Sequence, residues 1–406
     1  MKKYSKNIPD GTYDIIFDKT LYIKKAVEKF NKVYENLNYG EIITPTIEYY
    51  DVFDFNGQPI PQEMMYKMSD GSGRLIVLRP DNTTPIARVV STKLKDKKDN
   101  RDCLKIYYNQ NVFRANDGYT GRKSETIQSG IEIIGVNGIK TDIYCIETAI
   151  KILKSTGLNF KLEIGHVGFY KSIINSMDLT DCEKETIRLY IESKNMGEIN
   201  KLESEEYKII RMIPQLFGGY EVIEKARILA GDNKNAQNVL DYLYRLYKVL
   251  DHTGYGEHII IDLGIVHEID YYTGVVISGY VDGIGENVLV GGRYDNLIAN
   301  FGVDLPAIGF AVNINLIAKA LENSKEENYE INKINKIAPS EIVHYDPESY
   351  FKALRYIEGR KKAYEFSKIE LSCFEDIEET NKYALSNGIQ KVVYIRDESD
   401  ESEVGI

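Results

Sequence analysis

The first clear pattern along the chain is a run of apolar residues spaced three and four positions apart between residues 21 and 38. This spacing puts them on one face of a helix, so we predict an amphipathic helix that ends near Gly40. The stretch that follows, residues 41–53, is typical of a strand but contains Pro45. Because proline within a strand is confined to edges and bulges, we expect the strand to be interrupted there.

A loop rich in glycine and proline leads to residues 74–90, with the sequence RLIVLRPDNTTPIARVV. The apolar start of this stretch is typical of a short strand, and its second half is typical of a helix. Asp81 and Thr83 lie at the junction, and both residue types favour the N-terminal cap of a helix. We therefore predict a strand that turns directly into a helix.

Residues 104–135 predict an antiparallel hairpin, because two strand-like runs flank the turn-rich segment ANDGYTGRKS. In the second run, Gln128 and Glu132 lie on one side of the strand, whereas Ile131 and Ile133 point to the other. Polar side chains on a buried face need partners. The polar face is therefore either exposed to solvent or part of a ligand site, and the residues alone leave both interpretations open.

Helical patterns with many charges follow over residues 141–155 and about 170–254, and the second is typical of a helical insertion. Three strand candidates come next, with the sequences HIIIDLG, DYYTGVVISGYV and ENVLVGG. This order is mixed and lacks a βαβ series. It favours an α+β fold with an antiparallel sheet flanked by helices, and we predict that this core covers residues 1–325.

A polar linker, ENSKEENYEINKINK, precedes a second predicted unit. Residues 336–396 alternate between strand and helix patterns, which predicts a small α/β domain with a parallel sheet. The remaining residues, 397–406, form an acidic tail that we expect to be disordered.

Composition and charge narrow the class of protein. The N-terminus is positively charged, but no apolar segment of a signal peptide follows, and no run reaches the roughly 18 apolar residues of a membrane span. The scattered cysteines are typical of a reducing compartment, so we expect a soluble cytoplasmic protein. The net charge of −11 weakens the case for nucleic-acid binding, which needs a basic face. The cysteines are Cys103, Cys145, Cys182 and Cys373.

General catalytic motifs are absent from the sequence. It contains no phosphate loop, no complete dinucleotide fingerprint, no HExxH and no GxSxG, and we predict neither a metal site nor a cofactor. Two clusters stand out: IDYYTG at 269–274, with polar tips expected on a strand, and GGRYD at 291–295, where Arg293 lies near an acidic residue. Taken alone, each cluster is equally compatible with ordinary β-structure.

Taken in order, these motifs resemble histidyl-tRNA synthetase over most of residues 1–320. PDGTYDIIF resembles the opening segment of that family, TPTIEYYDVF resembles its dimer-forming motif 1, and YYNQNVFR resembles its motif 2. IDYYTG resembles the histidine-specific signature, and GGRYDNL with PAIGFAV resembles the approach to motif 3. The resemblance implies a class II aminoacyl-tRNA synthetase-like fold that self-associates through motif 1.

The resemblance also implies a pocket for histidine. Glu132, Tyr272 and Tyr294 stand at the positions that read the imidazole ring, and Tyr271 belongs to the same signature. This assignment gives the polar face of the second hairpin strand a role in a ligand site.

Three further positions match residues that hold the backbone groups of the amino acid in the synthetase. Thr83 and Gln128 fall at two of them, and Asp81 stands at the α-amino position, where the synthetase has the longer glutamate. The shorter carboxylate changes the geometry expected at that end of the pocket.

The positions that handle ATP depart from the synthetase pattern. Arg114 matches the motif 2 arginine that grips the α-phosphate, but Asn116 replaces the glutamate that follows it. His267 and Leu316 stand where the synthetase has arginines. Losing one preorganised donor typically lowers a rate by on the order of 10²–10³. We therefore expect no catalytic residues and a pocket that binds without supporting aminoacylation.

A synthetase-like chain that keeps the amino-acid pocket but lacks these arginines resembles the family of ATP phosphoribosyltransferase regulatory subunits. These subunits are paralogues of histidyl-tRNA synthetase. Such a subunit has no catalysis of its own and assembles with the short catalytic subunit. It makes the first step of histidine biosynthesis possible and sensitive to histidine. The resemblance implies this partner and histidine as the ligand.

The C-terminal unit stands where the synthetase has its anticodon-binding domain, but it is short and acidic. Residues 331–406 contain 11 Lys and Arg against 15 Asp and Glu. An anticodon reader needs a basic or neutral RNA face, so we expect no tRNA partner. Two alternatives remain: a divergent but active histidyl-tRNA synthetase, and a synthetase-like module that binds another amino acid.

Overall fold

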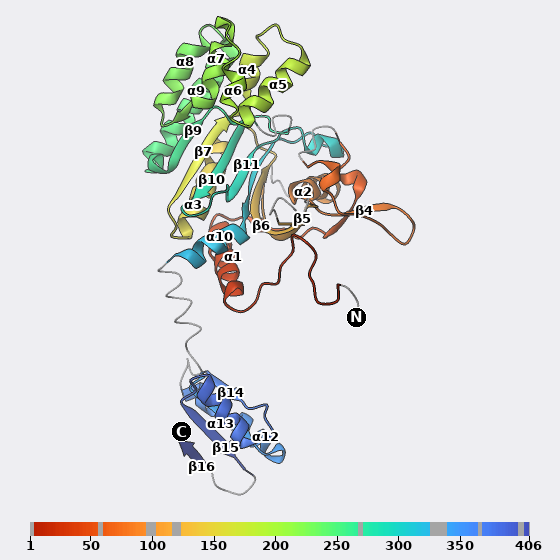
Figure 1. The fold of residues 1–406 in the computed structure, drawn as a ribbon, viewed down its shortest axis with the longest axis vertical. Helices are drawn as coiled ribbons and strands as arrows, with labels where there is room; N and C mark the ends of the chain where they lie inside the picture. Colours follow the sequence, from red (N-terminus) through yellow and green to blue (C-terminus); the bar gives the residue numbers. More distant parts are fainter. Residues whose placement is uncertain are drawn as a thin grey trace. The chain divides into compact units, whose positions relative to one another are not determined.

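The computed structural model describes residues 4–55, 60–94, 103–115, 123–266, 271–324, 339–363, 368–396 and 402–405. The chain divides into two compact units, Met1–Ser324 and Lys325–Ile406 (Figure 1). The first is built around a large mixed sheet and the second around a small one.

A nine-stranded sheet forms the centre of the first unit, in the order β1-β5-β6-β12-β11-β10-β7-β9-β8. Most neighbours are antiparallel, but β1 pairs with β5, and β7 with β9, in parallel. The predicted hairpin over residues 104–135 is confirmed, because β5 and β6 pair along their whole length. The strands are β1 (Gly40–Glu41), β5 (Leu104–Phe113), β6 (Glu125–Ile134), β7 (Phe160–His166), β8 (Phe217–Gly218), β9 (Ile259–Asp262), β10 (Val275–Val281), β11 (Leu289–Arg293) and β12 (Ala307–Asn313).

Three helices support this sheet. Helix α1 (Asp18–Asn36) packs against α3 (Ile139–Ser155) and α10 (Ile314–Asn323), which contact β12 and β6 respectively. The predicted amphipathic helix is confirmed, because α1 buries one side chain per turn. These side chains are Tyr22, Ala26, Phe30 and Tyr34.

A second, three-stranded sheet lies in the order β2-β4-β3. It contains β2 (Ile47–Tyr49), β3 (Lys67–Ser69) and β4 (Leu75–Leu78). Pro45 falls between β1 and β2, which belong to different sheets, so the predicted interruption is confirmed. After β4 the chain turns directly into α2 (Thr83–Val89), which confirms the predicted strand-to-helix junction.

The segment between β7 and β9 is mainly helical and gathers at one end of the large sheet, at the top of Figure 1. It is not helical throughout, because β8 within it pairs with β9 and extends the sheet. None of the helices in the described segments has the length and apolarity needed to cross a bilayer. The helices here are α4 (Val167–Ile174), α5 (Asp181–Glu192), α6 (Met196–Ile199), α7 (Lys208–Met212), α8 (Glu221–Ala230) and α9 (Lys234–His252).

The C-terminal unit has a four-stranded sheet in the order β14-β13-β15-β16. The first three strands are parallel, and α12 and α13 pack into separate apolar clusters, the first around Val343 and the second around Ile342. Neighbouring strand residues point to opposite faces, so the two helices cover opposite faces of the sheet. Its elements are β13 (Glu341–Tyr345), α12 (Tyr350–Ala363), β14 (Ile369–Leu371), α13 (Ile377–Ser386), β15 (Lys391–Ile395) and β16 (Ser402–Gly405).

The expectation that the acidic tail is disordered is wrong for Ser402–Gly405. This segment forms β16, which pairs antiparallel with β15. Without it, β15 would be an edge strand with unpaired backbone N–H and C=O groups. The backbone pairing satisfies those groups whatever the charge of the side chains.

Candidate ligand-binding site

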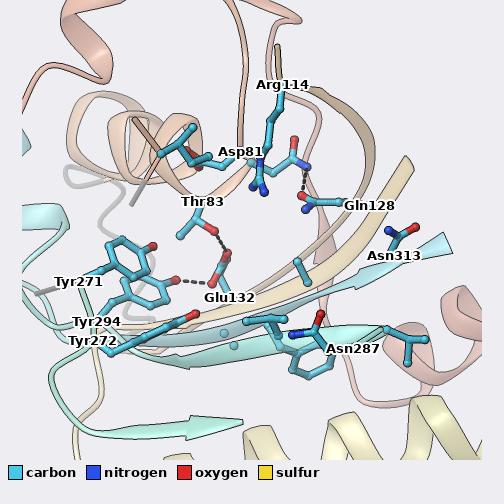
Figure 2. Close-up of a pocket in the computed structure, with 18 of the residues that line it drawn as sticks. Asp81, Thr83, Arg114, Gln128, Glu132, Tyr271, Tyr272, Asn287, Tyr294 and Asn313 are labelled. Carbon is cyan, nitrogen blue, oxygen red and sulfur yellow. Dashed lines mark hydrogen bonds between the residues drawn. The ribbon is translucent and has the colours of Figure 1, made fainter. Parts of the chain in front are cut away.

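A cavity of about 300 Å³ lies over β6, β11 and β12 and is bordered by the start of α2 (Figure 2). This volume is at the lower end of the range for small-molecule sites, roughly 300–1,000 Å³. Its walls bring together every residue that the sequence assigned to the pocket, although they come from widely separated segments. These residues are Asp81, Thr83, Arg114, Gln128, Glu132, Tyr271, Tyr272 and Tyr294.

Glycines keep the floor of the cavity open. Gly309 on β12 pairs with Glu132 on β6 and with Gly292 on β11, so the three lie side by side across the sheet. A Cβ atom on Gly309 would lie only 1.8 Å from Glu132 Oε2, and one on Gly292 would lie 2.8 Å from Tyr272 Cδ1. The absence of side chains at these positions leaves room for the polar groups of the pocket.

Glu132 is a deeply buried polar group of the site, with 1% of its surface exposed. Thr83 Oγ1 donates a 2.8 Å hydrogen bond to Glu132 Oε1, and the Tyr294 hydroxyl donates to Oε2 (Figure 2). Burial raises the pKa of this carboxyl to about 8, although both donated hydrogen bonds oppose the shift. Near neutral pH the carboxyl is mostly protonated, and a cationic group placed against it would favour the ionised form.

Three tyrosines form the aromatic wall of the pocket. The ring of Tyr271 stacks on that of Tyr294 at 5.6 Å between centroids and meets Tyr272 edge-on at 5.0 Å. Burial and the nearby Glu132 raise the pKa of Tyr294 well above its ordinary value, so its hydroxyl keeps its proton and donates. The expectation that Tyr271 and Tyr272 lie on a strand is wrong, because β10 begins only at Val275.

A buried ion pair holds the segments that carry these tyrosines. The guanidinium of Arg293, next to Tyr294, pairs with Asp142 of α3 and, at 3.0 Å, with Asp295. The carbonyl oxygen of Arg293 accepts a 2.7 Å hydrogen bond from the backbone N–H of Thr273, the residue that follows Tyr272. Arg293 is therefore a structural residue that fixes the two tyrosine segments against each other.

The start of α2 carries Asp81, Asn82 and Thr83 into the pocket. Asp81 Oδ1 accepts the backbone N–H of Thr84 at 2.7 Å, which ties Asp81 to the first turn of α2, but the N-cap residue of the helix is Asn82. Thr83 does not cap the helix, because its hydroxyl turns inward to Glu132. Burial raises the pKa of Asp81, and its hydrogen bonds to Thr84 and the charge of Arg114 oppose that shift.

Arg114 is the single cation among the described residues that line the cavity. Its Nε donates a 2.9 Å hydrogen bond to the carbonyl of Pro80, and its guanidinium lies between Asp81 and Gln128 in Figure 2. The lining also contains two carboxyl groups, those of Asp81 and Glu132. One cation near two acidic groups suits a small zwitterion better than a polyphosphate.

Among the positions that depart from the activation residues of the synthetase, the structure describes Leu316. Leu316 is buried in the first turn of α10 and does not line the cavity. Asn315 is engaged elsewhere, because its Oδ1 accepts the backbone N–H of Ile127 at 2.8 Å. His267, Asn116 and Arg122 lie outside the described residues.

Sequence comparison missed three asparagines that line the cavity, Asn82, Asn287 and Asn313. Asn82 lies between two residues that were assigned to the pocket, Asp81 and Thr83. That position could have indicated that Asn82 also lines the cavity. Asn287 lies two residues before β11, and Asn313 is the last residue of β12. Only the pairing of these strands, which local sequence does not reveal, brings them to the cavity.

Comparison with known proteins places this geometry in a family. A family model described as histidyl-tRNA synthetase matches residues 11–317. An ATP phosphoribosyltransferase regulatory subunit from Clostridium botulinum is 41% identical, over 97% of this chain and 92% of the relative. One from Clostridium acetobutylicum is 42% identical, over 97% and 95%. The chain belongs to the family of ATP phosphoribosyltransferase regulatory subunits.

Solved structures agree with this assignment. A Bacillus halodurans structure described as an ATP phosphoribosyltransferase regulatory subunit/histidyl-tRNA synthetase is 29% identical, with a TM-score of 0.82 over 98% of this chain and all of that one. A histidyl-tRNA synthetase from Nostoc is 19% identical, with a TM-score of 0.74 over 99% and 97%, and shows the fold alone. The predicted regulatory-subunit family and class II synthetase-like fold are confirmed.

Proposed function

We propose that this chain is the non-catalytic regulatory subunit of an ATP phosphoribosyltransferase and that its pocket binds free histidine. The observation that carries the proposal is the buried Glu132, held between Thr83 and Tyr294 at the floor of a cavity of amino-acid size. Such a group suits an imidazole, which can donate from one ring nitrogen and accept at the other.

Histidine would lie with its ring against Glu132 and the hydroxyls of Tyr272 and Tyr294. Stacked Tyr271 would add an apolar surface beside the ring. Because the Glu132 carboxyl has a raised pKa, it can donate to an unprotonated ring nitrogen or, when ionised, accept from a ring N–H. The backbone end of the amino acid would then face the start of α2 and Gln128.

The electrostatics of the pocket argue against amino-acid activation. Adenylate formation needs fixed positive charge around the phosphates of ATP. Among the described lining residues that charge is limited to Arg114, and Leu316 at the second arginine position is an apolar side chain. The chain would therefore bind histidine as a signal and not as a substrate.

The proposed partner is a short-form ATP phosphoribosyltransferase catalytic subunit, which this chain would activate and make sensitive to histidine. We infer that both act in the cytoplasm and that no tRNA takes part. The acidic composition of residues 331–406 supports the second inference.

We also infer that two copies of this chain associate through the motif 1 region. Several large apolar side chains of β2, β3, β4 and the preceding loop are exposed there, which is typical of a protein interface. They are Ile43, Ile47, Tyr49, Met68 and Leu75.

Two measurements on the purified full chain test the proposal. Isothermal titration calorimetry should detect binding of L-histidine and no comparable binding of other common amino acids. Exchange of pyrophosphate into ATP in the presence of histidine should stay at background. Robust exchange would instead identify an active synthetase, and the absence of heat with histidine would contradict the pocket assignment.

A further inference from the structure

Asn82 is a buried side chain with one hydrogen-bonding group still unsatisfied. It lines the cavity and has 1% of its surface exposed. Its Nδ2 donates a 3.2 Å hydrogen bond to Gln128 Oε1, but its Oδ1 has no partner within the part of the chain that the structure describes. Because buried polar atoms are nearly always paired, this oxygen is free to accept from a donor other than the described residues, such as a bound ligand.

The neighbouring Asp81 carboxylate is not a fully available acceptor for a ligand. Both oxygens of Asp81 already accept from Thr84, Oδ1 from the backbone N–H at 2.7 Å and Oδ2 from the hydroxyl at 3.1 Å. Asp81 therefore contributes a carboxyl group at this end of the pocket, while much of its hydrogen-bonding capacity is taken up by Thr84 in the first turn of α2. Asn82 Oδ1 is the uncommitted acceptor beside it.

The contact between Asn82 and Gln128 also sets the direction of the second amide. Since Gln128 Oε1 accepts from Asn82, the Gln128 Nε2 group is left to donate. Arg114 lines the same side of the cavity. This end of the pocket thus presents acceptors at Asp81 and Asn82 and donors at Gln128 and Arg114.

We propose that Asn82 is a ligand-binding residue whose side-chain oxygen accepts a hydrogen bond from the ammonium group of a free α-amino acid. This inference rests on the proposed function and extends it. It assigns recognition of the free ammonium group to Asn82, a residue that the resemblance to the synthetase did not point to.

Three ligands separate the ammonium contact from the rest of the site. L-histidine carries both backbone groups, histamine keeps the ammonium, and 3-(imidazol-4-yl)propionate keeps the carboxylate. In calorimetry on the full chain, Asn82→Ala should weaken binding of the first two by roughly 10- to 100-fold, the range for a lost hydrogen bond to a charged group. Binding of the propionate should change by less than about threefold.

Two further variants guard against a general loss of folding. Asn82→Asp keeps an acceptor at this position and should restore most of the affinity for histamine. Asn287→Ala removes an amide from the part of the lining that lies across the pocket from Asp81 in Figure 2, and it should cause no loss specific to ammonium.

The outcomes separate this inference from the proposed function. If Asn82→Ala weakens all three ligands equally, or none of them, Asn82 does not bind the ammonium and the inference is wrong. If the unmodified chain fails to bind L-histidine, the proposed function falls and this inference falls with it. A loss confined to the two ammonium ligands, with recovery in Asn82→Asp, supports both.

Discussion

Replacing Glu132 with glutamine should stabilise the chain at alkaline pH, and the gain should fade at acidic pH. The Glu132 carboxyl is buried and its pKa is raised from an ordinary value of 4.5 to about 8. Between these two values the folded chain keeps a proton that the unfolded chain releases. The free energy of unfolding therefore falls as pH rises through this window and levels off above about pH 8.

The size of the effect follows from that window. A single group contributes up to about 1.4 kcal/mol per pH unit, so the full shift corresponds to about 5 kcal/mol. Glutamine does not titrate. Its amide oxygen can still accept a hydrogen bond from one of the two hydroxyls, those of Thr83 and Tyr294, and its amide nitrogen can donate to the other. The variant should thus lie close to the wild type near pH 5 and be clearly more stable near pH 9.

Urea unfolding of the full chain, followed by circular dichroism at a series of pH values without added histidine, measures this difference. Glu125→Gln is the matched control, because it makes the same chemical change on the same strand outside the cavity lining. If the curves of Glu132→Gln and the wild type run parallel from about pH 5 to about pH 9, the carboxyl does not carry the proton and the reasoning is wrong.

Three other variants test separate parts of the site. Glu132→Ala should weaken histidine binding by about 1–3 kcal/mol in calorimetry, because a buried ring N–H loses its acceptor. Gly309→Ala should abolish binding, since its Cβ would lie 1.8 Å from Glu132 Oε2, whereas Gly285→Ala, with no atom within 4 Å, should bind normally. Arg293→Met should lower the free energy of unfolding in urea by about 3–5 kcal/mol, because it leaves the buried Asp142 carboxylate unpaired. Unchanged affinity in Glu132→Ala or Gly309→Ala, or an unchanged urea transition in Arg293→Met, would contradict the corresponding assignment.

Several features of the fold could be read from the sequence because they depend on local periodicity. The apolar spacing in α1 reflects which face of the helix is buried, and the structure has that face as predicted. In β6 the alternation separates the apolar from the polar side chains, but the second half of the strand is buried on both faces. The grouping of Gln128 and Glu132 with the tyrosines came from a resemblance to a family. Periodicity alone did not decide whether that polar face is exposed to solvent or belongs to a ligand site.

Other features depend on contacts between distant segments, which no local pattern contains. Asn313 reaches the cavity because β12 pairs with β6, and β16 exists because β15 offers an edge. The role of Gly309 appears only when β12 is placed beside Glu132. Arg293 could not be assigned from the sequence because its partner, Asp142, lies about 150 residues away and only the folded chain joins them.

The activity of a short-form ATP phosphoribosyltransferase catalytic subunit tests the central claim most directly. The rate at which it joins ATP and phosphoribosyl pyrophosphate would be measured alone, with this chain, and with this chain and increasing L-histidine. We predict that the chain raises the rate and that histidine then lowers it, with Glu132→Ala requiring more histidine for the same inhibition. A rate that is the same with and without the chain, and indifferent to histidine in its presence, would contradict the claim.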